Sequence, residues 1–437
     1  MIHLIFLRLP WRTRPHLLTD PVAAPVRPQK ILNGEVHDWY RIILGFSDHL
    51  VSQLIDRFKI QEGDWILDPF CGSGTTLVEC LKRGINAVGI DANPSSCFAA
   101  RVKADWTLDG RRLRENAGKA RRGYLREIRT KHHLEDPTYL YLDKTGFIKR
   151  GWMSEKPLRK ALALKIAIQG LNVTPRYKSA LMLALVAEVT ASASNVKFGP
   201  ELYCGPSKEN HDVLDGFLGR VETMAADLAT VSDVARSTVT VVLGDSRNCG
   251  GLAEVSKHAP YAAIICSPPY PAEHDYTRNS RLELAFLDHV ADLPSLRAIK
   301  KAMIRSHSKG IYVTDSDGKE VAGNRRVMEV VKEIQKKAEL KTHGFARYYP
   351  IVAKEYFGGI KKHLAAVVPL LKDDGFCAYV VGDQSSYLGV HIPTAEIIRE
   401  LAHEVGFKTA TIEHWRNRWS TTNSKNMEEH ILVLRKV

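Results

Sequence analysis

The sequence predicts an α/β fold with a doubly wound, mostly parallel sheet that is interrupted by helical and basic insertions. Residues 65–91 read as a short apolar strand, a glycine-containing loop, a helix and a second strand, which make one β-α-β unit. Residues 238–243 and 261–266 are apolar and rich in β-branched residues, as expected of further buried strands. Residues 376–383 predict another strand, and segments 410–415 and 428–437 predict an antiparallel strand pair.

The composition bounds the class of protein. The chain has 437 residues, of which 44% are hydrophobic, enough for a large core. Its net charge of +13 favours a polyanionic partner, most commonly nucleic acid, although a generic basic protein also fits. The seven cysteines form no C-x-x-C pair, which argues against a disulfide framework or a zinc site and favours a cytoplasmic location. No apolar run reaches transmembrane length, so no membrane partner is expected. Because the cysteines form no zinc-site pattern, no metal is expected either.

A glycine loop follows the first predicted strand and precedes a helix. The loop reads Asp68-Pro69-Phe70-Cys71-Gly72-Ser73-Gly74-Thr75, and its glycines allow a tight turn beside a ligand. Neither the P-loop pattern nor the full dinucleotide fingerprint is present, and the Asp68 carboxylate would repel a phosphate. Asp91 ends the next strand, where a ribose diol lies in doubly wound sheets. The two carboxylates suit a zwitterionic ribose-bearing ligand such as S-adenosyl-L-methionine, although Asp91 also reads as an ordinary helix cap.

A second motif, Ser267-Pro268-Pro269-Tyr270, follows the predicted strand at 261–266. Two consecutive prolines fix φ and hold the backbone carbonyls in an extended loop. The Ser267 hydroxyl and the Pro268 carbonyl can accept hydrogen bonds from an exocyclic amine, and Tyr270 can stack on a base withdrawn from its helix. The alternative is a simple proline-terminated strand.

The two motifs together resemble the DNA amino-methyltransferases, which methylate cytosine N4 or adenine N6. The resemblance implies binding of S-adenosyl-L-methionine by the glycine loop and Asp91, with Asp245 meeting the cofactor adenine. The implied cofactor-binding residues are Asp68, Pro69, Phe70, Gly72, Ser73, Gly74, Thr75, Asp91 and Asp245, and the implied catalytic residues are Ser267, Pro268, Pro269 and Tyr270.

The serine that opens the tetrad resembles the form associated mainly with N4-cytosine enzymes, whereas adenine enzymes usually carry Asp or Asn there. The resemblance therefore implies site-specific methylation of cytosine N4 in double-stranded DNA. Alternatives are an N6-adenine enzyme, an RNA base amino-methyltransferase and a catalytically inactive DNA-binding protein. A restriction-modification setting is expected, with a cognate restriction endonuclease as a further partner that the sequence itself does not decide.

The resemblance divides the chain into six segments. They are an N-terminal arm at 1–34, a first catalytic part at 35–100, a helical insertion and candidate target-recognition region at 101–236, a second catalytic part at 237–296, a basic insertion and candidate DNA contact at 297–345, and a C-terminal catalytic part at 346–437.

Basic side chains in the insertions and polar side chains after the tetrad are the candidates for contact with nucleic acid. The set is Arg111, Arg112, Arg121, Arg122, His274, Arg278, Lys300, Lys301, Arg325 and Arg326. A further aromatic-basic cluster, His414-Trp415-Arg416, lies in the predicted C-terminal strand pair and is a candidate to face DNA.

Overall fold

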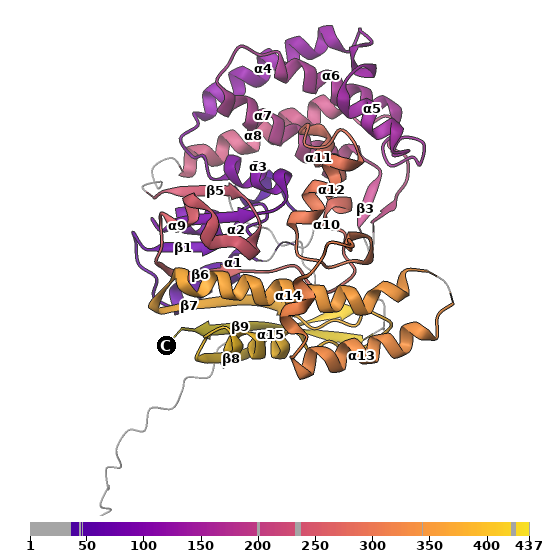
Figure 1. The fold of residues 1–437 in the computed structure, drawn as a ribbon. Coiled ribbons are helices and arrows are strands. Elements are labelled where there is room, and N and C mark those ends of the chain that lie inside the picture. The colour runs from indigo at the N-terminus through magenta and orange to yellow at the C-terminus, as the bar shows by residue number, and fades with distance from the viewer. Residues whose placement is uncertain are drawn as a thin grey trace, which may run out of the picture.

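Seven strands form one sheet in the order β5-β2-β1-β6-β7-β9-β8 (Figure 1). Strands β5, β2, β1, β6 and β7 are parallel to their neighbours, and β9 pairs antiparallel with both β7 and β8. The strands are β1 (Trp65–Asp68), β2 (Asn86–Asp91), β5 (Val239–Leu243), β6 (Tyr261–Cys266), β7 (Leu371–Gly382), β8 (Thr409–Ser420) and β9 (Lys425–Arg435). The predicted α/β class with a mostly parallel sheet is confirmed.

This computed structural model describes residues 36–42, 45, 47–198, 202–231, 237–342, 344–420 and 425–436. The predicted N-terminal arm at 1–34 lies outside the described residues.

The strand order reverses next to β1. From β1 the chain moves outward through β2 to β5, and it then returns to β6 on the other side of β1. In open α/β sheets, ligands bind beyond the carboxyl ends of the strands at such a switch point. The glycine loop follows β1 and the Ser-Pro-Pro-Tyr tetrad follows β6, so the fold places both motifs at the switch point.

Alternate strand residues face two different cores, as expected for a sheet covered on both sides. Ile66 and Ala263 pack with helices α1 (Asp48–Arg57) and α2 (Thr75–Leu81). Their neighbours Leu67 and Ile264 pack on the opposite face, against the helices α13 (Arg325–Glu339), α14 (Tyr349–Val367) and α15 (Thr394–Glu404).

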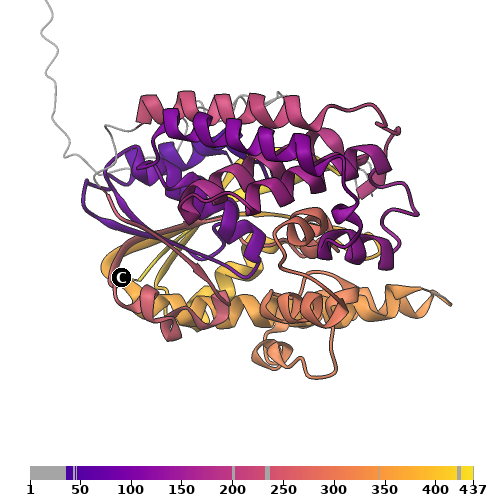
Figure 2. The same cartoon turned by 90° about the horizontal axis from the view of Figure 1, so that it is seen from above.

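A helical body covers the α2–α3 side of the sheet, opposite α13 and α14 (Figure 1 and Figure 2). It comprises α4 (Gly110–Glu127), α5 (Pro137–Lys144), α6 (Glu155–Gln169), α7 (Pro175–Glu188) and α8 (Val213–Val231), packed against α3 (Pro94–Lys103). A hairpin of β3 (Val196–Phe198) and β4 (Leu202–Cys204) follows α7 after a π-helical turn at Val189–Ala193. The shorter helix α9 (Ala253–Ser256) precedes β6, and α10 (Tyr276–Asn279), α11 (Arg281–Phe286) and α12 (Leu293–Ala302) follow the tetrad.

Helix α14 contains Gly358 and Gly359 in its interior. Gly358 is required because a Cβ there would lie 1.9 Å from the backbone oxygen of Asp317, in the 3-10 turn Asp317–Val321. The loop that contains this 3-10 turn therefore packs directly on α14.

Candidate active site

A cavity lies at the carboxyl ends of the parallel strands. Residues from the glycine loop, the end of β2, the tetrad, the loop after α12 and the β8–β9 hairpin all line it. Of the predicted cofactor-binding and catalytic residues, those in the wall are Pro69, Phe70, Gly72, Ser73, Thr75, Asp91, Ser267, Pro268, Pro269 and Tyr270. The structure thus brings the two predicted motifs into one cavity, although they are almost two hundred residues apart in sequence.

The glycine loop has the backbone geometry that its sequence predicts. Gly72 and Gly74 have φ of 51° and 88°, the left-handed region that favours glycine. The amide of Gly72 donates to Asp91 Oδ2 at 2.9 Å, so the loop after β1 is held to the end of β2. Thr75 begins α2, whose unpaired N-terminal amides lie beside the loop.

Hydrogen bonds of the Ser267, Tyr276 and Tyr356 hydroxyls fix the tetrad. The Ser267 hydroxyl donates to the Val380 carbonyl of β7 at 3.2 Å. The Tyr356 hydroxyl donates to the Pro269 carbonyl at 2.8 Å, and the amide of Tyr270 donates to the Tyr276 hydroxyl at 3.2 Å. Neither backbone contact uses the Pro268 carbonyl, so the Ser267 oxygen and this carbonyl remain as acceptors in the cavity wall.

Comparisons with known proteins agree with this geometry. A model of the DNA methylase family that unites N6 and N4 enzymes matches residues 45–101, the segment with the glycine loop and Asp91. Type II methyltransferase M.BsoBI of Geobacillus stearothermophilus is 24% identical over 92% of this chain and 85% of its own length. Type II methyltransferase M.AvaI of Anabaena variabilis is 23% identical over 86% of this chain and 79% of its own. Type II methyltransferase M.MjaII of Methanocaldococcus jannaschii is 46% identical over 61 residues, which are 13% of this chain and 12% of that protein.

Residues 45–101 thus match the N4/N6 family of DNA methylases, and most of the chain is similar to type II methyltransferases. This similarity implies S-adenosyl-L-methionine as the cofactor. No helix within the described part of the chain is long and apolar enough to cross a membrane.

Asp91 fits the ribose end of this cofactor. Its Oδ2 accepts from Gly72 and its Oδ1 accepts from the amide of Asn93 at 2.7 Å. Each carboxylate oxygen can accept a further hydrogen bond, as a diol requires. Burial raises the pKa of Asp91 to about 6, and the backbone amides oppose that rise. Asp91 therefore holds the loop and keeps acceptor capacity for its predicted role, which stays a prediction.

Asp68 lies beneath the glycine loop rather than in the cavity wall. Its side chain is fully buried, and its Oδ1 accepts from the amide of Phe70 at 3.1 Å. Its Oδ2 has no hydrogen-bond partner among the described residues. Burial raises the pKa of Asp68 to about 7. An orphaned buried oxygen next to the loop is what a cationic amine would complete, but Asp68 and Gly74 do not themselves line the cavity.

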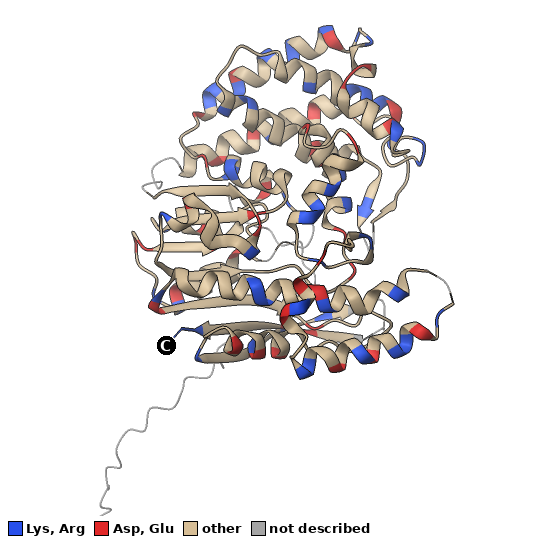
Figure 3. Ribbon diagram, in the orientation of Figure 1, with Lys and Arg blue, Asp and Glu red and all other residues tan. Residues whose placement is uncertain are grey.

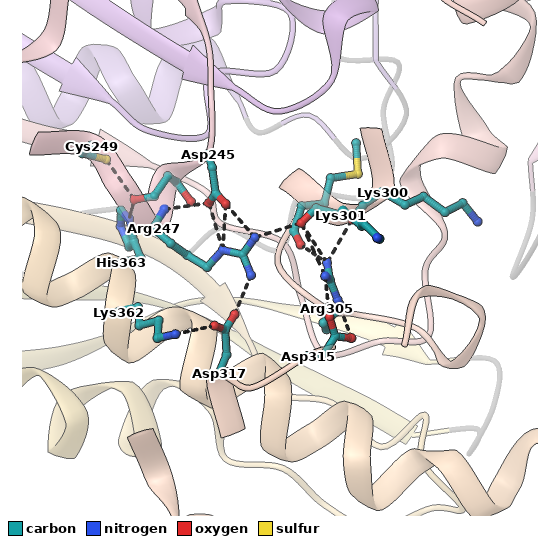
Figure 4. Close-up of polar contacts among 12 residues, drawn as sticks. Asp245, Arg247, Cys249, Lys300, Lys301, Arg305, Asp315, Asp317, Lys362 and His363 are labelled. Atoms are coloured by element: carbon teal, nitrogen blue, oxygen red, sulfur yellow. Dashed lines mark hydrogen bonds and ion pairs between the residues drawn. The ribbon is translucent and has the colours of Figure 1, made fainter. Parts of the chain in front are cut away.

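Asp245, expected to meet the cofactor adenine, is engaged by a neighbouring arginine instead. Arg247 donates from its Nε to Asp245 Oδ1 at 2.9 Å and from its Nη2 to Asp245 Oδ2 at 2.6 Å (Figure 4). The same guanidinium contacts Asp317, which Lys362 also contacts at 2.8 Å. Asp245 lies outside the cavity wall and Ser246 lies within it. The Asp245 carboxylate thus anchors the end of β5 to α14 and its 3-10 turn.

Several predicted nucleic-acid contacts have carboxylate or carbonyl partners within the protein. Lys300 donates to Asp275 at 2.6 Å, and its side chain is 11% exposed. Arg326 pairs with Glu396 and Glu400, and Arg325 lies near Glu329. The guanidinium of Arg278 contacts the Leu202 carbonyl and lies over the Trp152 ring. These side chains therefore have partners within the protein, and their contact with DNA stays a prediction.

The other residues that were predicted to contact nucleic acid lie at different distances from the cavity. His274 lines the cavity. Lys301 is exposed at the end of α12, directly before cavity-wall residues 302–304. Arg111, Arg112, Arg121 and Arg122 are exposed on α4, at the far side of the helical body (Figure 1 and Figure 3).

The sequence did not indicate two carboxyls in the cavity wall, Glu283 and Glu429. Glu283 is buried and accepts from the Tyr40 hydroxyl at 2.7 Å, and burial raises its pKa to about 7. Glu429 lies in β9 and is joined in the wall by Trp415, Arg416 and Arg418 of β8. The predicted aromatic-basic cluster supplied a partial signal, since Trp415 and Arg416 face the cavity, whereas His414 is exposed.

Among the described residues, His37, Asp48 and Glu79 are close enough together to hold a metal ion. Glu79 already accepts from His37, Lys82 and Arg83, each at 2.9 Å. The two cations neutralise this carboxylate, so the cluster reads as a buried ion-pair network.

Proposed function

We propose that this enzyme transfers a methyl group from S-adenosyl-L-methionine to the exocyclic N4 of cytosine at specific sites in double-stranded DNA. The observation that carries the proposal is the position of Ser267. Its hydroxyl oxygen stands at the head of the tetrad, in the same cavity as the glycine loop and Asp91. In the family that the chain resembles, serine at this place is associated mainly with N4-cytosine enzymes.

The contacts of Ser267 support a role in holding the target amine. Because its hydroxyl proton is donated to Val380, the oxygen keeps lone pairs for an amine N–H. The Pro268 carbonyl is a second acceptor next to it. Two acceptors on one amino group raise the electron density on nitrogen and direct its lone pair. The bound cofactor supplies the electrophilic methyl group. The proton that the nitrogen must lose leaves to water.

The location of the cavity supports action on a base that has left its helix. Ser267 and Tyr270 are only partly exposed, at the end of a buried strand, where a stacked base pair cannot reach. Enzymes that modify such atoms extrude the target nucleotide into a pocket. Tyr270, in the wall, offers an aromatic face for stacking. Positioning and fixed acceptors then carry most of the catalysis.

The wider setting that we propose is restriction-modification, because the relatives that span most of the chain are named type II methyltransferases. A cognate endonuclease is then a partner. We propose that the helical segment at 101–236 reads the target sequence, and that α12 of the segment at 297–345 contacts DNA while residues 302–304 complete the cavity wall.

The deciding experiment identifies the product. Unmethylated duplex DNA and, in parallel, RNA are incubated with the enzyme and the cofactor, digested to nucleosides and analysed by mass spectrometry. We expect N4-methylcytosine in DNA. N6-methyladenine would retain the mechanism but overturn the interpretation of Ser267. A product in RNA alone would change the substrate, and no product would favour an inactive DNA-binding protein.

Substitution of Ser267 tests its role directly. We expect Ser267→Ala to lower kcat on the order of 10²-fold, because one fixed acceptor is lost in the transition state. Cofactor affinity, measured by titration calorimetry, should be unchanged. Ser256→Ala, which removes an exposed hydroxyl that contacts Gly250, is the matched control and should leave both quantities unchanged. Loss of cofactor affinity in Ser267→Ala would show that the assigned role is wrong.

A further inference from the structure

The β8–β9 hairpin forms one wall of the catalytic cavity. Its register shifts between His414 and Arg416, which leaves Trp415 bulged out of the regular pairing. Bulges next to active sites re-aim side chains. Here consecutive residues, Trp415 and Arg416, both line the cavity, although in a regular strand they would point to opposite faces.

Glu429 organises this wall. It is 3% exposed and pairs with Gly382 across β7 and with Arg416 across β8. Its Oε2 accepts from Arg416 Nε at 2.5 Å, and its Oε1 accepts from the Tyr270 hydroxyl at 3.5 Å. The carboxylate therefore connects the hairpin to the tetrad. A Cβ at position 382 would lie 3.1 Å from the Tyr270 ring, so glycine there allows the close approach.

The two arginines of the wall differ in how they are bound. Arg416 has two partners within the protein. Its Nε donates to Glu429, and its guanidinium carbon lies 4.1 Å from the centre of the Trp415 ring. Within the described part of the chain, the Arg418 side chain has an ion-pair contact only, from its Nε to Glu429 Oε1 at 3.4 Å. That Nε is buried and has no hydrogen-bond partner among the described residues. Arg418 is thus a donor in the cavity wall that makes no hydrogen bond to the residues that the structure describes.

We propose that Arg418 reads the ring edge of the target cytosine by donating to its N3 and O2 acceptors. This inference rests on the proposed function and adds the residue that selects the base. Ser267 and Pro268 offer acceptors that match the cytosine amine, and Arg418 offers donors that match the two adjacent acceptors. Adenine has an amine and a ring nitrogen but a C–H in place of the carbonyl. Glu429 and Arg416 are positioning residues that hold Arg418 and Tyr270.

The test separates contacts to the exocyclic amine from contacts to the N3 and O2 acceptors of the ring. The methylated position is first located by single-molecule sequencing of the product DNA. A short duplex is then made with 2-pyrimidinone at the target position, a base that keeps N3 and O2 but lacks the amine. We expect Arg418→Gln to bind this duplex roughly tenfold or more weakly than wild type, the range for loss of a specific base contact. Arg418→Lys should recover part of the affinity, and Ser267→Ala should bind like wild type.

Controls distinguish base reading from folding and from general DNA binding. Asn417→Ala, an exposed residue between the two arginines, should not change binding. Cofactor affinity and thermal unfolding of Arg418→Gln should match wild type. Equal binding of the 2-pyrimidinone duplex by Arg418→Gln and wild type would overturn the proposal, even if wild type makes N4-methylcytosine. If wild type makes only N6-methyladenine, the proposed function itself fails, and the cytosine-edge assignment fails with it.

Discussion

Three carboxyl groups near the cavity have raised pKa values. Asp68, Asp91 and Glu283 lie at the carboxyl end of the sheet or against it, and burial is the largest influence on each pKa, which rises to about 7, 6 and 7 respectively. A carboxyl in this range is partly protonated at neutral pH. These carboxyl groups suit a cationic ligand. Without such a ligand, burial makes their full ionisation energetically unfavourable.

The raised pKa of Glu283 can be tested through the pH dependence of stability. Its pKa in the folded protein is about 7, above the ordinary value of 4.5, so the folded state binds more protons than the unfolded state between those values. Stability from this group is therefore fully present below about pH 4.5 and is lost as pH rises to about 7. Glu283→Gln, which can still accept from Tyr40, should gain stability relative to wild type over that window, by roughly 2–3 kcal/mol at most.

Urea unfolding of the cofactor-free protein at a series of pH values measures the difference. Glu115→Gln, an exposed carboxyl on α4, is the control and should parallel wild type at every pH. A stability difference between Glu283→Gln and wild type that does not change with pH would show that Glu283 is already ionised in the folded protein.

At the scale of elements, one arginine joins the end of β5 to two segments that come much later in the chain. Arg247 binds Asp245 and Asp317, and its Nη2 donates to the Lys301 carbonyl at 3.0 Å (Figure 4). Arg305 likewise donates to the carbonyls of Lys300 and Met303. These contacts hold residues 302–304 against the cavity, so the basic insertion is built into the catalytic unit.

Removing the Arg247 guanidinium should therefore affect both stability and the cavity. We expect Arg247→Met to lower the free energy of unfolding by about 3 kcal/mol, because Asp245 loses its guanidinium partner and the poorly exposed Asp317 keeps only Lys362. Cofactor affinity should fall as well. Lys362→Met also removes a contact to Asp317 but from a more exposed position, and it should cost about 1 kcal/mol or less. Urea unfolding and calorimetry measure the two effects; equal losses in both variants would contradict the bridging role.

At the scale of the molecule, the parts that sequence could predict are those that depend on local residues. Each strand pattern, and each of the two loops after β1 and β6, consists of residues that are contiguous in the sequence. The parallel sheet and the two motifs could therefore be predicted from the sequence. Glu429 gave no such signal, because it reaches the cavity only through antiparallel pairing of β9 beside Gly382. The pairing of Lys300 with Asp275 and of Arg326 with Glu396 was equally hidden, since charge runs do not reveal partners on other elements.

The position of the basic side chains leads to a final prediction about DNA binding. Lys301 is exposed on α12, next to the cavity wall, whereas Arg121 and Arg122 lie on α4, at the end of the helical body that is far from the sheet (Figure 1). A duplex that delivers a base to the cavity passes α12 but not the far face of the helical body. We expect Lys301→Gln to weaken duplex binding and to reduce the slope of log affinity against log salt by about 1, as for one lost phosphate contact.

Fluorescence anisotropy at several salt concentrations gives this slope for each variant. The double variant Arg121→Gln/Arg122→Gln removes twice the charge from α4, so a general effect of net charge would lower its affinity at least as much. We expect its slope to equal that of wild type. A reduced slope in the α4 variant together with an unchanged slope in Lys301→Gln would place the DNA along α4, at the far end of the helical body, instead of along α12.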